Sequence, residues 1–249
     1  MHGNQKIYLL APAFNEEESL LGLLHRVDAF VKTQEHPLQF VLVNDGSVDK
    51  TKEIFNTFQG SFEKHLIDVQ TNKGLANAFR EGYAYIQNVI QKDDVLVTMD
   101  ADDSHNPHQI GDMLRKIENG YNFVVASRFQ PQSISKGLSL FRKITGTGAG
   151  WLFRVFIPID NIRDFTCGYR LVTGELFQEV CEKYRGRLVE EKGFSCAPEF
   201  LLKSSKCDMI AAEIPMVLRY DRKIGASKMK VWKTILNTLQ IVIKYHTRY

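Results

Sequence analysis

Five short apolar runs occur in the first half of the chain, and stretches with helical periodicity separate them. The runs are rich in Val, Ile and Leu and mostly continuous, which is typical of strands buried on both faces of a parallel sheet. Because strands and helices alternate, we expect an α/β fold with a mostly parallel central sheet flanked by helices. The predicted strands are Ile7–Ala11, Gln39–Val43, Leu66–Gln70, Asp94–Met99 and Asn122–Ser127.

The helices between these strands have recognisable ends. Asn15, with Glu18 three residues later, reads as a capping box that begins the first helix. A second helix is expected directly after Gly74, and a third is expected to begin near Pro107 and stop at Gly120. The 249 residues contain no internal repeat and no low-complexity linker, so one domain is the simplest organisation.

Charge, cysteine spacing and the length of the apolar runs argue against a nucleic-acid-binding, a disulfide-bonded and a membrane-spanning protein. The net charge of +3 gives no general reason to expect nucleic-acid binding. The four cysteines form no C-x-x-C pair and are expected to be reduced thiols. No apolar run reaches the length of about 18 residues that a spanning helix needs, and no signal-peptide core is visible, so we expect a cytoplasmic protein.

Two segments in the second half are basic, aromatic and amphipathic, and both tryptophans of the chain fall in them. They are residues 134–157 and residues 231–245. Such a helix can lie in a membrane interface, which suggests a protein peripherally associated with the membrane. For the C-terminal helix, we prefer packing on the body of the protein or on a partner, which includes an integral membrane protein. Amphipathicity alone does not separate such packing from binding to a membrane surface.

Three polar motifs follow predicted strands. They are Ala11–Glu17, Asn44–Ser47 and Asp100–Asp102. Turn-forming residues are common at strand ends, so each motif alone has a structural explanation. Open α/β sheets bind their ligands at the carboxyl ends of the strands. The three motifs in this order therefore predict a binding site at that edge.

The aspartates of the third motif suggest a metal site. Residues i and i+2 of an extended segment point the same way, so Asp100 and Asp102 can face one hard cation. Mg²⁺ or Mn²⁺ bound there would leave positions for water and phosphate oxygens and would offset the charge of a departing diphosphate. Asp45, after an earlier strand, is placed to accept hydrogen bonds from a nucleobase or ribose.

Taken together, the motifs resemble family-2 glycosyltransferases of the GT-A fold, and within them the dolichol-phosphate mannosyltransferases and bacterial polyprenyl-phosphate glycosyltransferases. The resemblance extends from about Ile7 to Met229. The segments that carry it are Pro12–Glu16, Asn44–Ser47, Asn72–Ala78, Asp100–Pro107, Ser127–Arg128, Asp164–Arg170, Lys192–Phe194 with Glu199, and Arg222–Lys228.

The resemblance implies a role for each matching residue. Asp102, Arg128 and Arg142 would be catalytic, with Asp100 and Asp102 as the metal ligands and Arg128 and Arg142 as the ligands of an acceptor phosphate. The residues implied to bind the nucleotide-sugar are Pro12, Phe14, Glu16, Val43, Asp45, Asp100, Ala101, Asp102, Arg222 and Lys228. A GT-A catalytic domain would span 1–229, with a nucleotide-binding half of about 1–129 and an acceptor-binding half of about 130–229, before an amphipathic helix over 230–249.

This chain departs from the family pattern at two motifs. The usual D-D-G-S is Asn44-Asp45-Gly46-Ser47, and a Gln found two residues after the D-x-D in some relatives is Ser104 here. Asp45 is interpreted as the retained nucleotide contact. His105 is either a metal ligand or a residue of the helix start, and the latter is preferred because Pro107 follows.

The implied reaction is an inverting transfer of a hexose, with mannose from GDP-mannose as the leading choice, to a polyprenyl or dolichyl phosphate. An ionised phosphate attacks without a general base, so catalysis reduces to positioning and charge stabilisation. One alternative is a sugar hydroxyl acceptor in glycan assembly, for which Glu199 or Asp164 would be candidate bases. Another is a non-catalytic nucleotide-sugar binding module.

Overall fold

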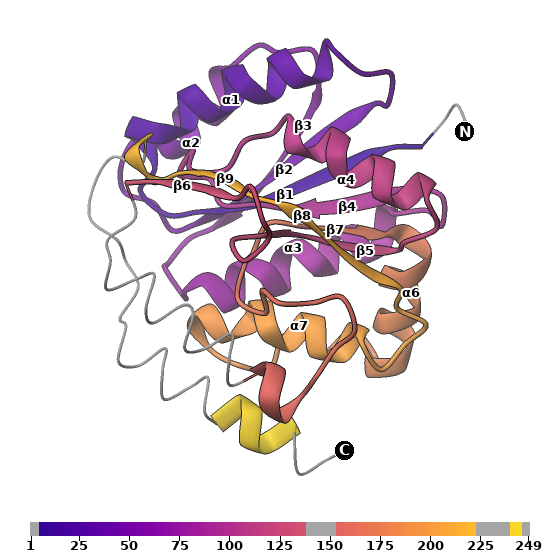
Figure 1. Ribbon diagram of the computed structural model, residues 1–249. Helices are drawn as coiled ribbons and strands as arrows, with labels where there is room; N and C mark the ends of the chain where they lie inside the picture. Colours follow the sequence, from indigo (N-terminus) through magenta and orange to yellow (C-terminus); the bar gives the residue numbers. More distant parts are fainter. Residues whose placement is uncertain (1–4, 138–152, 223–239, 246–249) are drawn as a thin grey trace.

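The structure, a computed structural model, describes residues 5–137, 153–222 and 240–245. A seven-stranded sheet with the order β3-β2-β1-β4-β7-β5-β8 forms its centre, and β6 pairs with β9 beside it (Figure 1). The strands are β1 (Ile7–Ala13), β2 (Leu38–Asp45), β3 (Glu63–Val69), β4 (Val95–Thr98), β5 (Phe123–Ser127), β6 (Ile134–Lys136), β7 (Arg170–Thr173), β8 (Ala211–Pro215) and β9 (Val217–Arg219).

Helices cover both faces of the sheet (Figure 1). α1 and α4 lie over one face, and α3, α6 and α7 lie over the other. The helices are α1 (Glu17–Val31), α2 (Thr51–Thr57), α3 (Leu75–Val89), α4 (Gln109–Glu118), α6 (Gly174–Tyr184) and α7 (Cys196–Ser204), with short 3₁₀ turns η1 (Gly193–Ser195) and η2 (Tyr220–Arg222). This arrangement confirms the predicted α/β class.

The five predicted strands all exist, and four of them form a parallel block. β3, β2, β1 and β4 run parallel. The central residues of β2, β1 and β4 are fully buried between the two helical layers, whereas β3, at the edge of the sheet, is only partly buried. β1 continues two residues past the predicted end at Ala11, so Pro12 lies within the strand, opposite Val43 of β2. Burial on both faces explains why the sequence of these strands is continuously apolar.

The second half of the chain completes the same sheet in a less regular way. β7 runs antiparallel to both of its neighbours, β4 and β5, whereas β5 and β8 are parallel. The sheet is therefore mixed but mostly parallel. No strand was predicted for β7 or β8, because a segment of four or five residues without clear periodicity does not separate a strand from a buried helix.

The predicted start of the first helix is wrong. α1 begins at Glu17, and no side chain caps it. Asn15 has a φ of 51° and lies in the preceding turn, where its side chain accepts a hydrogen bond from the Val48 N–H at 2.9 Å. The Asn15 side chain therefore binds a distant backbone group and does not cap α1, as the capping box would require. The second helix begins directly after Gly74 as predicted.

The third predicted helix is present with shifted ends. α4 begins at Gln109, two residues after Pro107, and ends at Glu118. Gly120 follows it with a φ of 89°, a left-handed conformation that glycine adopts without steric cost. All four cysteines are free, as predicted.

The amphipathic segments are described only in part. Ile134–Lys136 forms strand β6, so the first of them does not start as a helix. Residues 240–245 are helical, and Ile241, Val242 and Tyr245 are buried in the main core while Lys244 pairs with Glu191 at 2.6 Å. This part of the C-terminal helix packs on the body, as preferred. Within the described ranges, no helix has both the length and the apolar character needed to cross a bilayer.

Candidate active site

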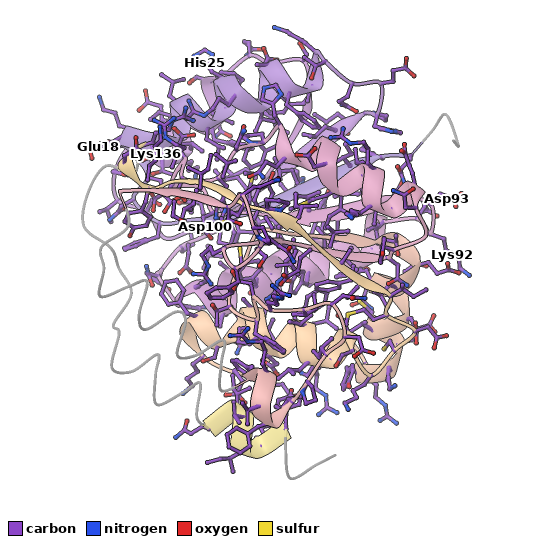
Figure 2. The ribbon with its side chains drawn as sticks, in the orientation of Figure 1. Glu18, His25, Lys92, Asp93, Asp100 and Lys136 are labelled. Atoms are coloured by element: carbon purple, nitrogen blue, oxygen red, sulfur yellow. The ribbon has the colours of Figure 1, made fainter. Side chains whose placement is uncertain are left out.

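Most of the predicted site residues that the structure describes lie at the carboxyl ends of the parallel strands. Figure 2 shows Asp100 beyond the end of β4, on the same side of the molecule as Glu18 and Lys136 and opposite Asp93, which precedes β4. The loops after β1, β2, β4 and β5 therefore share one edge, the location that the sequence predicted.

The two aspartates of the D-x-D motif lie in different environments. β4 ends at Thr98, so Asp100 and Asp102 lie in the loop after it and not in a strand, as the i, i+2 argument assumed. The side chain of Asp100 is 48% exposed, whereas Asp102 is only 5% exposed. Ala101 between them is buried. One carboxylate is therefore open to solvent, and the other is set into the loop.

Two side chains that follow the motif hold these aspartates in place. The Ser104 hydroxyl donates to Asp102 Oδ1 at 2.6 Å, and the Ser104 N–H donates to the same oxygen at 3.1 Å. His105 Nδ1 accepts a hydrogen bond from the Asp100 N–H at 3.2 Å, and its ring stacks on Tyr169. His105 lies four residues before α4, so its preferred reading as a helix-start residue is wrong.

The donor atoms of this loop fit a hard divalent cation. Carboxylate oxygens are the ligands that Mg²⁺ and Mn²⁺ prefer, and one or two of them suffice where water and substrate phosphates complete the shell. Among the residues that the structure describes, no group of three or more His, Cys, Asp or Glu side chains could hold a metal ion by itself. The half-exposed Asp100 and its neighbour Asp102 match a site that the substrate helps to complete.

On one side of this loop, hydrogen bonds from backbone groups hold the turns after β1, β2 and β3. We call this group the β2 side: Asn15, Asp45, Gly46, Ser47, Lys73 and Gly74. Asp45 is 3% exposed, and its two carboxylate oxygens accept from the N–H groups of Lys73 at 3.1 Å and Gly74 at 2.7 Å. The Asp45 side chain thus fixes the turn that leads into α3.

Close backbone packing completes the β2 side. Gly46 has a φ of 70°, and a Cβ there would lie 2.5 Å from the Asn72 nitrogen, so only glycine fits. Ser47 Oγ accepts from the Asn15 N–H at 2.9 Å. Pro12 and Val43 are paired within β1 and β2, and Phe14 and Glu16 are partly buried in the loop after β1. The structure brings all four of these predicted nucleotide contacts to one edge.

On the other side of the loop, a buried ion pair follows β5. We call Arg128, Asp164 and Thr166 the β5 side. The Arg128 Nε and one terminal nitrogen donate to the two oxygens of Asp164 at 2.8 and 2.6 Å, and the guanidinium also reaches Thr166 Oγ1 at 2.6 Å. Asp164 is fully buried, whereas the Arg128 side chain is 25% exposed. The Arg128 side chain therefore keeps part of its surface open to solvent, although both of its bonds to Asp164 are enclosed.

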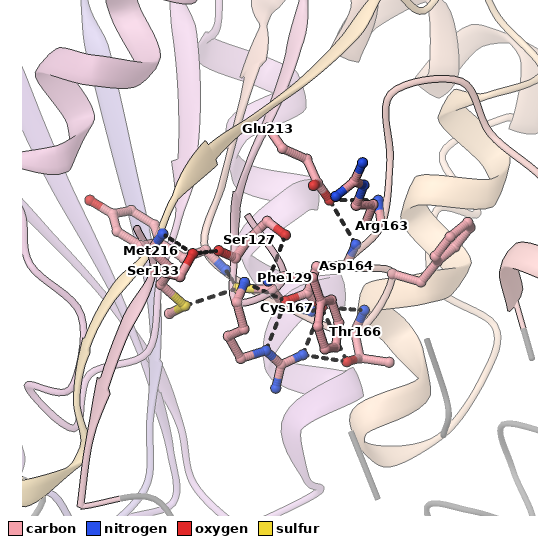
Figure 3. A network of polar contacts seen from close by, with 12 residues as sticks. Ser127, Phe129, Ser133, Arg163, Asp164, Thr166, Cys167, Glu213 and Met216 are labelled. Carbon is pink, nitrogen blue, oxygen red and sulfur yellow. Dashed lines mark hydrogen bonds and ion pairs between the residues drawn. The ribbon is translucent and has the colours of Figure 1, made fainter. Parts of the chain in front are cut away.

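Further hydrogen bonds anchor Asp164 to the sheet (Figure 3). The N–H groups of Arg163 and Asp164 both donate to Glu213 Oε1 at 2.7 Å, and the Gln130 amide donates to Glu213 Oε2. Glu213 lies on β8 and is 8% exposed. A single carboxylate on the edge strand thus holds the segment before Asp164 and the segment after Arg128.

Electrostatics keep this ion pair charged. Burial alone would raise the pKa of Asp164, but the charge and hydrogen bonds of Arg128 outweigh it and hold that pKa below its ordinary value. Burial would lower the pKa of Arg128, whereas Asp164 and the more distant Asp100 raise it above its ordinary value. The pair stays ionised at neutral pH, and Asp164 is not available as a base.

The β5 side and the C-terminal part of the sheet converge on the D-x-D loop. A Cβ at Gly168 would lie 3.8 Å from Asp100 Oδ1, and the Arg219 N–H donates to the Ser104 carbonyl at 2.8 Å. η2, which ends with Arg222, directly follows Arg219. The predicted residue Arg222 is therefore brought near the loop, whereas Arg142 and Lys228 lie outside the described residues.

Sequence reasoning missed several residues that build this site. Thr166, Glu213 and Ser104 all hold predicted site residues, but each is a common polar residue with no local signal. Glu199, weighed as a base, is fully buried and accepts from the N–H groups of Glu190 and Glu191 and from Lys203. A carboxylate enclosed in this way has a structural role.

The chain is similar to a known protein family and to several characterised proteins. A profile described as "Glycosyl transferase family 2" matches residues 8–181. The chain is 27% identical over 240 residues to a dolichol-phosphate mannosyltransferase of Pyrococcus furiosus, covering 96% of this chain but 63% of that protein. It is 26% identical to a polyprenol monophosphomannose synthase of Mycolicibacterium smegmatis, covering 90% of this chain and 81% of the relative.

Solved structures support the fold. A glucosyl-3-phosphoglycerate synthase from Mycobacterium tuberculosis, crystallised with Mn²⁺, UDP and phosphoglyceric acid, superposes with a TM-score of 0.67. The match covers 97% of this chain and 78% of that chain at 14% sequence identity. At this identity the similarity establishes the shared GT-A architecture and leaves the substrates of this chain to its own residues.

Proposed function

This chain belongs to glycosyl transferase family 2, and we propose that it transfers a hexose from a nucleotide-sugar to a polyprenyl or dolichyl phosphate, with inversion at the anomeric carbon. Mannose, carried by GDP, is the sugar we propose, because the relatives named above are a mannosyltransferase and a monophosphomannose synthase. The chain spans less than two thirds of the first of these relatives, so the activity is argued below from the site.

The observation that carries the proposal is the orientation of Arg128 near the D-x-D loop. Asp164 and Thr166 fix its guanidinium group, and the Arg128 side chain is 25% exposed at the edge where the strands end. A guanidinium held in this way presents its remaining donors to an anion, and its planar fork matches a phosphate. We assign Arg128, with Arg142, to the acceptor phosphate.

The donor would bind across the loops of the β2 side and the D-x-D loop. Pro12, Phe14, Glu16, Val43 and Asp45 surround the proposed nucleoside position, with Asp45 acting chiefly through the Lys73–Gly74 turn that it holds. Asp100 and Asp102 would hold Mg²⁺ or Mn²⁺, which supplies positive charge to the diphosphate leaving group. Arg222 and Lys228 would hold the diphosphate.

A phosphate acceptor also fits the state of the nearby carboxylates. A hydroxyl acceptor needs a base to remove its proton. Asp164 is bound by Arg128 with a lowered pKa, and Glu199 is enclosed by three donors. A lipid phosphate is already ionised at neutral pH, so its oxygen attacks without a base and the site needs only to position it.

We also propose that the protein works at the cytoplasmic face of a membrane, where its lipid acceptor lies, with a nucleotide-binding half ending near residue 129 and an acceptor-binding half beyond it. The basic, aromatic residues of 134–157 support this placement. Association through an integral membrane partner fits the same residues, and the contact of Lys244 with Glu191 places part of the C-terminal helix on the body.

The test is a transfer assay with GDP- and UDP-sugars, a polyprenyl phosphate and Mn²⁺, followed by extraction of the lipid product. Radiolabel in the lipid phase is expected with wild type and is expected to disappear with Asp102→Asn. Near-normal transfer by Asp102→Asn would refute the metal assignment.

Arg128→Ala combined with Arg142→Ala distinguishes the acceptors: loss confined to phosphate acceptors supports the proposal, and an equal loss with glycan acceptors supports the hydroxyl alternative. Binding of nucleotide-sugar without transfer or hydrolysis would indicate a non-catalytic module.

A further inference from the structure

The residue after the D-x-D motif has an unusual backbone conformation. Asp103 has a φ of 61°, in the left-handed region that residues with a Cβ rarely occupy. Such a conformation persists only where its surroundings hold it. Because Asp103 directly follows Asp102, whatever holds Asp103 also sets the position of both proposed metal ligands.

The partner of Asp103 comes from a different layer of the fold. Its carboxylate forms an ion pair with Arg26 of α1, and the two side chains are 8% and 28% exposed. Asp103 Oδ1 has no hydrogen-bond partner among the described residues, so Arg26 is its main compensation. α1 has a glycine here: a Cβ on Gly22 would lie 3.2 Å from Arg26 and 3.3 Å from Asp103. The helix surface leaves room for the pair.

Other cations lie around the same loop. Burial lowers the pKa of Arg26, and the neighbouring charges of Arg222 and Arg219 lower it further. The Arg219 N–H also binds the Ser104 carbonyl. Asp103 thus neutralises a cation that would otherwise face Arg222, the residue assigned to the donor diphosphate.

We propose that Arg26 and Asp103 form a tether that positions the Asp100–Asp102 loop and Arg222 for binding of the metal and the diphosphate. This inference rests on the function proposed above. Neither residue touches the reacting atoms; both act through Asp102 and Arg222. The tether joins the loop to α1, whereas Ser104 and His105 stabilise the loop from within.

The first test uses metal-free protein and measures hydrogen exchange. Arg26→Gln and Asp103→Asn are compared with wild type and with Lys32→Gln, which breaks the exposed Lys32–Asp28 pair on the same helix. Asn tolerates the left-handed conformation, so Asp103→Asn removes the charge without adding strain. The amides of Ser104 and Asp100 are expected to exchange about tenfold faster or more in both tether variants. Unchanged exchange in both variants would overturn the tether.

The second test measures Mn²⁺ binding with GDP by electron paramagnetic resonance. Loss of a residue that supports metal ligands commonly weakens binding about tenfold to a hundredfold, and this is the expected effect of Asp103→Asn. Arg26→Lys should restore most of the affinity that Arg26→Gln loses. The double variant of Arg26→Gln and Asp103→Asn should bind Mn²⁺ more tightly than the sum of the two single losses predicts, because it leaves no unpaired charge.

The outcomes separate this inference from the proposed function. Wild type that binds Mn²⁺ with neither GDP nor UDP would refute the metal assignment, and the exchange experiment would still decide whether the tether exists. Wild-type affinity in Asp103→Asn, with strictly additive effects in the double variant, would show that the ion pair does not position the loop. Thermal melting of each variant confirms that it is folded.

Discussion

On the β2 side of the site, backbone N–H groups donate to Asp45 and Ser47, whereas on the β5 side two full charges, Arg128 and Asp164, meet in a buried pair. The first arrangement uses neutral donors to shape turns around one carboxylate. The second fixes a cation at one place. Removal of one member of a buried pair leaves an uncompensated charge, so the two sides are expected to respond very differently to mutation.

The largest effect is expected from Asp164→Asn. This change leaves Arg128 without its counter-ion and removes acceptors from several donors. We expect the free energy of unfolding to fall by about 3–5 kcal/mol. Transfer to a phosphate acceptor should fall much more than donor hydrolysis. Urea unfolding and the two assays measure these effects. Asp160→Asn, on a nearby exposed residue, is the control and should behave as wild type. Equal stability of Asp164→Asn and wild type would contradict the importance of the pair.

The second prediction concerns pH. The folded pKa of Asp164 lies below its ordinary value of 3.8, so its contribution to stability is complete well above pH 3.8 and is lost as the pH falls through the folded pKa. The difference in unfolding free energy between wild type and Asp164→Asn should therefore be constant from pH 8 to 5 and shrink below about pH 4. Urea unfolding across this range measures it. A difference that grows on acidification would reverse the assigned sign.

A smaller effect is expected on the β2 side from Asp45→Asn. One of the two backbone N–H groups would then face the amide nitrogen and lose its acceptor, at a cost of about 2 kcal/mol. Because the Lys73–Gly74 turn loosens, the KM for the nucleotide-sugar should rise while kcat changes little. Steady-state kinetics at saturating acceptor test this. A fall in kcat with unchanged KM would place Asp45 with the reacting groups.

The smallest effect is expected from Ser47→Ala, which removes only the acceptor of the Asn15 N–H. The expected loss of stability is about 1 kcal/mol. Donor KM should rise less than in Asp45→Asn. Thermal melting and the same kinetic assay provide the comparison. An effect larger than that of Asp164→Asn would invalidate the contrast between the two sides.

The same contrast explains what could be predicted from sequence. The apolar runs of β1, β2 and β4 are buried on both faces, and this burial is visible in composition alone. The motifs of the β2 side follow those strands directly, so their place at the sheet edge was predictable. Asn15 was misassigned because its partner, the Val48 N–H, lies 33 residues away. Local patterns contain no information on such a contact.

The β5 side depended on contacts even more distant along the chain. Asp164 reaches Arg128 over 36 residues, and Glu213 reaches Asp164 over 49. The resemblance to a family indicated Arg128 and the segment that contains Asp164, but no residue pattern indicated that Asp164 would neutralise Arg128. His105 was misassigned because Pro107 suggested a helix start, whereas the ring stacks on Tyr169, more than 60 residues later.

The reversed direction of β7 has a consequence for how such enzymes diversify. The parallel strands end at the catalytic edge, whereas β7 begins there because it runs in the opposite direction. The segment that leads into β7, Asp164–Tyr169, therefore approaches this edge from outside the sheet. Both neighbours of β7 fix its register, so insertions upstream of Asp164 need not disturb the parallel block of β1 to β4. On the division proposed above, grafting residues 129–163 from relatives with other acceptors is expected to give chimeric enzymes that keep their donor and change their acceptor.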